Sequence, residues 1–246
     1  MALVIGKAGP YEFGQVTIDY SDGVTDGADQ IVGTNVIDHI YAGGGNDIIK
    51  GGGGADTING GEGRDGASYE DSDVGVQVSL VTGKGHGGTA EGDTLISVED
   101  LYGSKHDDQL VGNSGDNLLS GGDGNDILKG GGGTDVLKGG AGDDTMQIDG
   151  VEDHVYGGEG NDTLVVSSQE GLVINLSSGF IDVNPYTSPG DYFHAPHSNP
   201  NGPFGPFGPY PHAPGDAKQV SDVENVVGSN YSDKIVGTDG DRKSVV

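Results

Sequence analysis

Aspartate is the residue whose type and spacing in this sequence could do chemistry. It follows runs of glycine at nine-residue intervals, in two separate stretches of the chain. When the nonapeptides are aligned, position 6 is Asp in eleven of twelve copies and Asn in the other. These residues are Asp29, Asp38, Asp47, Asp56, Asp65, Asp108, Asn117, Asp126, Asp135, Asp144, Asp153 and Asp162. Carboxylates repeated in this way, in a chain without cysteine, are typical ligands of a hard metal cation.

The glycines at positions 1, 2 and 4 of the nonapeptide would provide the remaining ligands. Glycine permits positive φ, so the backbone can curl tightly with its carbonyls on one side. Calcium takes about six to eight oxygen ligands in a tolerant geometry, whereas magnesium is less suited to such a carbonyl-rich site. The pattern therefore predicts Ca²⁺ as the cofactor, with several ions stacked between the turns.

The elements that must position these ligands follow from the rest of the nonapeptide. Positions 7 to 9 predict a very short strand whose middle side chain points inward, because neighbouring side chains alternate faces. Position 8 is apolar throughout the second stretch, as Leu110, Leu119, Leu128, Leu137, Met146, Val155 and Leu164. Two nonapeptides then make one coil of strand, turn, strand and turn, so residues eighteen apart lie above one another.

The predicted coil stacks the position 6 residues in pairs. The pairs are Asp29 with Asp47, Asp38 with Asp56, Asp47 with Asp65, Asp108 with Asp126, Asn117 with Asp135, Asp126 with Asp144, Asp135 with Asp153 and Asp144 with Asp162. Asn117 brings one less charge, so we expect its site to bind calcium more weakly. An edge turn lacks one neighbour, and we expect half-sites at Asp29, Asp108 and Asp162.

The composition indicates a chain that needs a cation to fold. Among 246 residues there are 50 Gly, 32% are hydrophobic and the net charge is −28, with an isoelectric point near 4.1. Low hydrophobicity with many like charges keeps a chain disordered in water unless the charge is neutralised. A solvated surface or acidic tail would carry its acids in blocks, and a flexible linker would not repeat an apolar residue. With 11 Lys and Arg, the chain is a poor partner for nucleic acid.

The repeats divide the chain into segments. A lead-in covers residues 1–23, a first array 24–68, a spacer 69–102, a second array 103–165, a second spacer 166–227 and the start of a third array 228–246. Each spacer holds an alternating apolar stretch that predicts a short β-hairpin or strand pair: Val76, Val78 and Leu80 in the first, and Leu172, Ile174 and Leu176 in the second. In the third array Asp233 fits the pattern but Arg242 stands at the next position 6, so we expect either a truncated chain or a capping repeat, and we favour truncation.

The second spacer contains a proline-rich insert, residues 182–215. Nine of the ten prolines fall there, together with several aromatic residues. Proline at this density favours an extended surface loop. The alternatives are a docking segment for a partner, glycan or membrane, and a transition-metal site at His194, His197 and His212.

At these positions the sequence resembles the RTX family of hemolysin-type calcium-binding repeats, whose nonapeptide is G-G-x-G-x-D-x-U-x with U a large apolar residue. The resemblance implies an all-β chain that forms a parallel β-roll (RTX solenoid) in two arrays linked by β-hairpin-like spacers. It also implies type I secretion from a Gram-negative bacterium without a cleaved N-terminal signal, as in small secreted rhizobial members of the family. No apolar run is long enough for a secretory signal or a membrane span.

Three functions agree with these observations. We favour a secreted, non-enzymatic protein that folds on binding extracellular calcium and acts at a host or cell surface. Its partners are expected to be calcium and an extracellular polysaccharide, a host surface or a membrane. The alternatives are a calcium-dependent, non-catalytic module of a polysaccharide-modifying enzyme or protease, and an adhesin or pore-forming protein. The sequence holds no HExxH motif, no nucleophile elbow and no Cys, so no catalytic residues are assigned.

Overall fold

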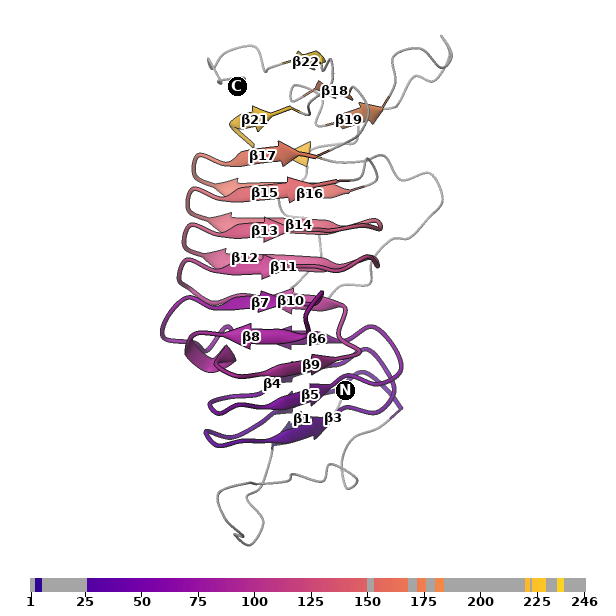
Figure 1. Ribbon diagram of the computed structural model, residues 1–246, viewed down its shortest axis with the longest axis vertical. Helices are drawn as coiled ribbons and strands as arrows, with labels where there is room; N and C mark the ends of the chain where they lie inside the picture. The colour runs from indigo at the N-terminus through magenta and orange to yellow at the C-terminus, as the bar shows by residue number, and fades with distance from the viewer. Residues whose placement is uncertain are drawn as a thin grey trace, which may run out of the picture.

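The structure is a computed structural model that describes residues 3–5, 26–149, 153–167, 172–175, 180–183, 220–221, 223–228 and 234–236. These residues wind into a solenoid of short strands stacked along its long axis (Figure 1). A short 3-10 helix, η2 (Gly88–Ala90), interrupts the strands. Within the described part, no helix is long and apolar enough to cross a membrane. The prediction of an all-β parallel roll is confirmed.

Two sheets face each other across the core. Among the described residues, sheet one has nine strands in the order β1 (Leu3–Ile5), β2 (Gln30–Val32), β4 (Ile48–Lys50), β6 (Gly66–Ser68), β10 (Asp100–Tyr102), β12 (Leu118–Asp123), β14 (Val136–Ala141), β16 (His154–Glu159) and β20 (Val220–Ser221). Sheet two has ten, in the order β21 (Asn225–Val227), β17 (Thr163–Val166), β15 (Thr145–Ile148), β13 (Ile127–Lys129), β11 (Gln109–Val111), β7 (Gln77–Ser79), β8 (Lys84–His86), β9 (Thr94–Ile96), β5 (Thr57–Asn59) and β3 (His39–Tyr41). Within each array, consecutive nonapeptides alternate between the two sheets.

Position 8 of the nonapeptide forms the core between the sheets. Its side chains are 0% to 2% exposed in both arrays: Ile31, Ile40, Ile49, Ile58, Ala67, Leu110, Leu119, Leu128, Leu137, Met146, Val155 and Leu164. Strand partners are eighteen residues apart, as in Leu110 opposite Leu128 and Leu128 opposite Met146. The predicted coil of two nonapeptides is therefore confirmed. Because each coil buries its apolar side chains against its neighbours, it is stable only within a stack.

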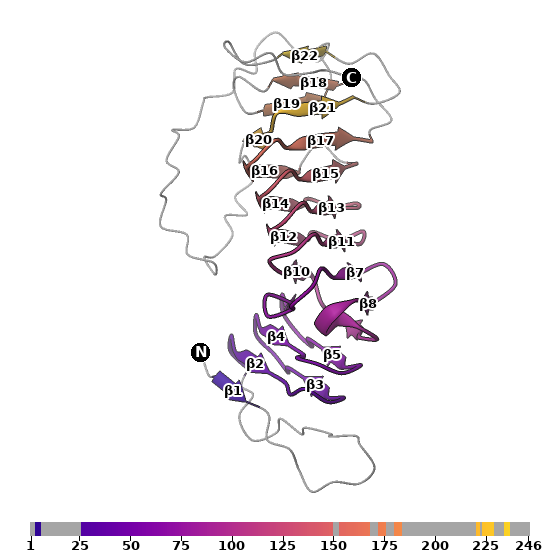
Figure 2. The same cartoon turned by 90° about the vertical axis from the view of Figure 1, so that its left-hand side faces the viewer.

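The first spacer widens sheet two but leaves sheet one continuous. In sheet one, β6 pairs directly with β10. In sheet two, β9 pairs with β5, β8 returns antiparallel between β9 and β7, and β7 pairs with β11. The predicted β-hairpin is confirmed here as β7 and β8, and three strands take the place of one. Figure 2 shows that the stack bends at this point, with β7 and β8 on the outer side and β10 on the inner side.

The second spacer also begins with a hairpin. β18 (Leu172–Asn175) and β19 (Phe180–Val183) are antiparallel, as expected, and β20 and β21 return to sheets one and two. β22 (Lys234–Val236) pairs with β18 in a third sheet. Asp233, Arg242, most of the lead-in, and the proline-rich insert beyond residue 183, with its three histidines, lie outside the described residues.

Candidate metal centre

The position 6 side chains line up at the turns and are all buried. Each of the twelve predicted site residues is at most 3% exposed. In all eight predicted pairs, the backbone N–H of the earlier residue donates to Oδ1 of the later one at 2.8 to 2.9 Å. The predicted stacking is therefore confirmed, and the pairs join into ladders along the edges of the solenoid.

The other carboxylate oxygen has no donor in the turns that begin with two small residues. Oδ2 is buried and without a hydrogen-bond partner at Asp47, Asp56, Asp65, Asp126, Asp135 and Asp144. A buried polar atom left unsatisfied costs about 1–3 kcal/mol, and more when it is charged. Buried charges in proteins are paired or coordinate a metal. A cation at these turns would remove the cost.

Glycine at position 1 leaves space beside that oxygen. A Cβ added at Gly51 would lie 2.6 Å from Oδ2 of Asp56, which is too close for any side chain. A Cβ added at Gly33 would meet the carbonyl oxygen of Gly51, one coil further on, and Oδ2 of Asp38 at 2.8 Å. The space is thus bordered by carboxylate and carbonyl oxygens from consecutive coils. This all-oxygen lining fits calcium.

Glycine at positions 2 and 4 gives the turn its curl. In the turn before Asp56, Gly52 and Gly54 have φ of +89° and +134°, a region that residues with side chains rarely adopt. A Cβ added at Gly52 would strike the carbonyl oxygen of Thr34 in the previous coil. Within the described residues, no group of three His, Asp or Glu side chains could hold a metal by itself. Calcium at these turns therefore needs backbone carbonyls as ligands.

Three turns, those of Asp38, Asp108 and Asn117, differ in their hydrogen bonds, and each carries a side chain at position 2. The backbone N–H groups of Thr34 and Ser104 each donate to Oδ2 of the position 6 Asp in the same turn at 2.5 Å. That of Asn113 donates to Oδ1 of Asn117, whose Nδ2 donates to the carbonyl of Glu99 at 2.8 Å. Each of these turns already provides a donor for one oxygen of its own position 6 side chain, although Oδ1 of Asp38 is buried without a partner. We therefore expect weaker calcium binding at all three, and not only at Asn117.

One residue that sequence reasoning missed is Asp93 in the first spacer. The N–H of Asp56 donates to Oδ1 of Asp93 at 2.8 Å, as it would to a position 6 Asp. Asp93 is fully buried, and its Oδ2 accepts from the Tyr69 hydroxyl at 3.2 Å. A signal was present, because Gly92–Leu95 reads G-D-T-L and β9 pairs in register with β5. The spacer therefore contains a degenerate repeat.

Two glutamates were missed as well. The N–H of Asp65 donates to Oε2 of Glu99, and that of Asp162 to Oε2 of Glu224, each at 2.9 Å. Asp162 thus has an acidic neighbour above it, and the expectation that it lacks one is wrong. The signal was the Val-Glu pair that both spacers share immediately before their return strand.

Burial shifts the pKa of these carboxyl groups upward. Loss of hydration raises the pKa of Asp65, Asp126 and Asp135 to about 7, and that of Asp56 and Asp144 to about 6. The backbone N–H that each accepts lowers the pKa, and neighbouring carboxylates raise it further. The folded turns therefore bind a proton readily when no metal supplies positive charge.

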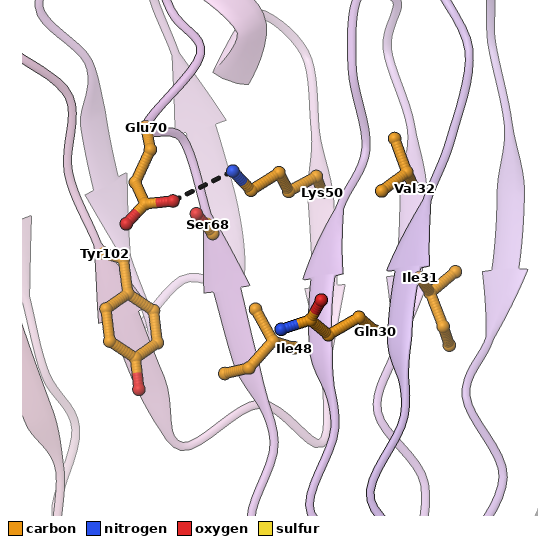
Figure 3. A pocket seen from close by; sticks show the side chains of 8 residues that line it. All are labelled: Gln30, Ile31, Val32, Ile48, Lys50, Ser68, Glu70 and Tyr102. Atoms are coloured by element: carbon orange, nitrogen blue, oxygen red, sulfur yellow. Dashed lines mark hydrogen bonds and ion pairs between the residues drawn. The ribbon is translucent and has the colours of Figure 1, made fainter. Parts of the chain in front are cut away.

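Away from the turns, sheet one carries an open groove of about 320 Å³ on the inner side of the bend. Figure 3 shows Tyr102 at one side, Ile48 between Tyr102 and Gln30, and Lys50 joined to Glu70 by an ion pair of 2.8 Å. The Oγ of Ser68 is buried here without a hydrogen-bond partner. The groove combines an aromatic ring, aliphatic surface and polar side chains.

Comparison with known families gives one match. The model of the RTX calcium-binding nonapeptide repeat (four copies) matches residues 25–49, 32–67, 102–137, 111–146 and 152–168. These ranges cover most of both arrays, with residues 147–151 left out, and they leave out most of the spacers. A search of curated proteins finds no match.

Proposed function

The two arrays of this chain are RTX calcium-binding nonapeptide repeats, and from this premise we propose a secreted protein that folds when extracellular calcium fills its turns. Its role is to bind at a host or cell surface, without catalysis. The observation that carries the proposal is the row of buried carboxylate oxygens without donors. Calcium binding adds its free energy to folding, because these ligands come together only in the coil.

Charge explains why calcium would act as a switch. With a net charge of −28 the calcium-free chain repels itself, and each bound ion removes two negative charges from that balance. Calcium sites in extracellular modules bind with Kd values of about 10⁻⁴–10⁻³ M, so the chain would stay unfolded in a cytosol. RTX repeats are typical of secreted bacterial proteins. An unfolded chain suits a narrow export channel, which supports the type I route.

The stacked ladders also support a non-enzymatic role. They account for the buried position 6 aspartates of both arrays as ladder residues and metal ligands, without a role in general acid or base catalysis. Turnover of a polysaccharide or a peptide by the purified chain would contradict this part of the proposal.

A calcium titration followed by far-ultraviolet circular dichroism tests the switch. At neutral pH we expect a transition from disordered to β-sheet signal with a midpoint of about 0.1–1 mM calcium. Magnesium at the same concentrations and matched ionic strength is the control, and it is expected to produce little β signal. Equal β content in chelator and in saturating calcium would show that calcium does not drive folding.

The groove on sheet one supports a specific partner, a neutral sugar unit of a surface glycan. The apolar face of a pyranose can pack on the ring of Tyr102, while its hydroxyls can pair with the polar side chains of Gln30, Lys50 and Glu70 that line the groove. An acidic glycan is disfavoured by the net charge of −28. Among the expected partners, an uncharged polysaccharide therefore fits this groove best.

Isothermal titration of the calcium-loaded protein with a neutral glucose hexasaccharide tests this partner. Tyr102→Ala is expected to weaken binding about tenfold, because it removes the aromatic platform. Tyr41→Ala is the matched control, since Tyr41 is 60% exposed on sheet two. Unchanged binding in Tyr102→Ala, or a preference for an oligouronate of the same length, would rule the assignment out.

A further inference from the structure

We propose that Glu99 is a calcium ligand that completes, with Asp65, the last metal site of the first array, and that Glu224 does the same with Asp162. The proposal rests on the calcium binding proposed above and extends it beyond the nonapeptides. Both glutamates lie outside the residues that the repeat family matches. The last calcium site of each array would then take one of its ligands from the spacer that follows the array.

Glu99 occupies the ladder position that a position 6 Asp would have. The N–H of Asp65 donates to Oε2 of Glu99 at 2.9 Å, just as the N–H of Asp47 donates to Oδ1 of Asp65 at 2.8 Å. The next strand, β10, pairs in register with β6, with Asp100 opposite Gly66. The glutamate therefore precedes its strand as the aspartate precedes its own.

The length of the turn explains why the acid is glutamate. A nonapeptide turn has six residues, as between the end of β5 at Asn59 and the start of β6 at Gly66. The spacer turn has three, between the end of β9 at Ile96 and the start of β10 at Asp100. A shorter turn extends less far from the sheets. The additional methylene of Glu99 restores the reach of its carboxylate.

The spacer also supplies a carbonyl at the expected place. A Cβ added at Gly60 would meet the carbonyl oxygen of Ser97 and Oδ2 of Asp65, just as one at Gly33 would meet the carbonyl of Gly51 and its own position 6 carboxylate. Ser97 has φ of +48°, and among the described residues it is the one non-glycine with positive φ. This strained conformation places the carbonyl beside the oxygen-lined space.

This group of oxygens includes two carboxylates, those of Asp65 and Glu99. Oδ2 of Asp65 is buried without a hydrogen-bond partner, and Asp65 itself is 0% exposed. The neighbouring cation, Arg64, forms an ion pair of 2.7 Å with Asp100. Its Nε also donates to Asp100 at 3.0 Å. These two contacts orient the guanidinium toward Asp100, and a bound cation would balance the charge at Asp65 and Glu99.

The second spacer repeats the arrangement at a separate place in the fold. Oε2 of Glu224 accepts the N–H of Asp162 at 2.9 Å. The carbonyl of Asp162 accepts the N–H groups of Glu224 and Asn225 at 2.9 and 2.8 Å, as the carbonyl of Asp65 accepts two successive N–H groups of the first spacer at 2.9 Å. Two segments of different sequence therefore close an array with the same backbone and carboxylate geometry.

Native mass spectrometry of the full chain in calcium tests the proposal by counting bound ions. Glu99→Gln and Glu224→Gln are each expected to lower the count by about one ion, and the double variant by about two. Gln retains the oxygen that accepts the N–H of the ladder, so circular dichroism in saturating calcium is expected to stay unchanged. Glu62→Gln is the matched control, because Glu62 is exposed on the same turn as Asp65.

Glu99→Asp provides a second test that keeps the charge but shortens the side chain, and it is expected to lose the same ion. If the wild-type chain bound no calcium, the proposed function itself would fail. If the wild-type chain bound calcium while Glu99→Gln and Glu224→Gln kept its full ion count and titration midpoint, the two glutamates would not be ligands. A full ion count in Glu99→Asp would overturn the argument from reach.

Discussion

In the calcium-free chain at about pH 5.5, we expect substantial β-sheet signal that is absent at about pH 7.5. Folding raises the pKa of several position 6 carboxyl groups to about 6 or 7, from about 4 in the unfolded chain. Between these limits the folded chain binds more protons than the unfolded chain, so its stability rises as the pH falls. Above about pH 7 the groups are ionised in both states and the full cost of burying charge applies.

The measurement is circular dichroism across this pH range, on protein stripped of calcium by gel filtration in chelator and then exchanged into calcium-free buffer. The expected effect is large, because each proton taken up on folding changes the equilibrium constant about tenfold per pH unit. The calcium-saturated protein is the comparison and should respond in the opposite sense, since protons compete with calcium for carboxylates. Loss of residual β signal on acidification of the calcium-free chain would contradict the raised pKa values.

Asp126→Asn is expected to raise the calcium midpoint of folding several-fold and to lower the number of bound ions. Asp126 lies inside the second array, where its N–H donates to Asp144 and its Oδ1 accepts from Asp108. Asn retains the oxygen that accepts the N–H of Asp108 but removes one negative charge from the ligand set. The number of charged ligands tunes the affinity of a calcium site. It also turns the unpartnered oxygen into a donor beside carbonyl oxygens. Because coils are stable only when stacked, loss of one site should weaken its neighbours.

Asp123→Asn serves as the matched control for this variant. Asp123 belongs to the same nonapeptide but is exposed, so the substitution removes one charge without touching the ladder. Calcium titrations of both variants under identical conditions separate a ligand effect from a net-charge effect. Equal midpoints in the two variants would mean that general charge, and not the buried carboxylate, governs folding.

Periodicity made the repeats readable from the sequence. A nine-residue interval with an apolar residue at position 8 fixes both the strand and the coil, and the pairing of Leu110 with Leu128 follows directly. The stacked pairs could be predicted because a ladder contact depends only on the eighteen-residue offset. Local rules were sufficient wherever the nonapeptide was intact.

The spacers were harder to read, because their contacts do not follow that offset. Asp93 stands thirty-seven residues after Asp56 and Glu99 stands thirty-four after Asp65. No fixed period predicts either distance, since the hairpin of β7 and β8 intervenes. A substitution of Glu for Asp also hides the acid from a search for the repeat. The different turns at Thr34 and Ser104 depend on one backbone N–H each, which residue type alone does not place.

At the first spacer sheet two gains more strands than sheet one, and this difference bends the solenoid. The length of the solenoid and the direction of its axis therefore depend on different parts of the chain. Adding or removing a whole coil within an array would lengthen or shorten one arm and leave the angle between the arms unchanged. The angle is set where sheet two has the three strands β9, β8 and β7 while sheet one passes directly from β6 to β10. The repeats therefore set how far the molecule extends, and the spacer sets which way it curves. Evolution could vary the two independently in a chain of this design.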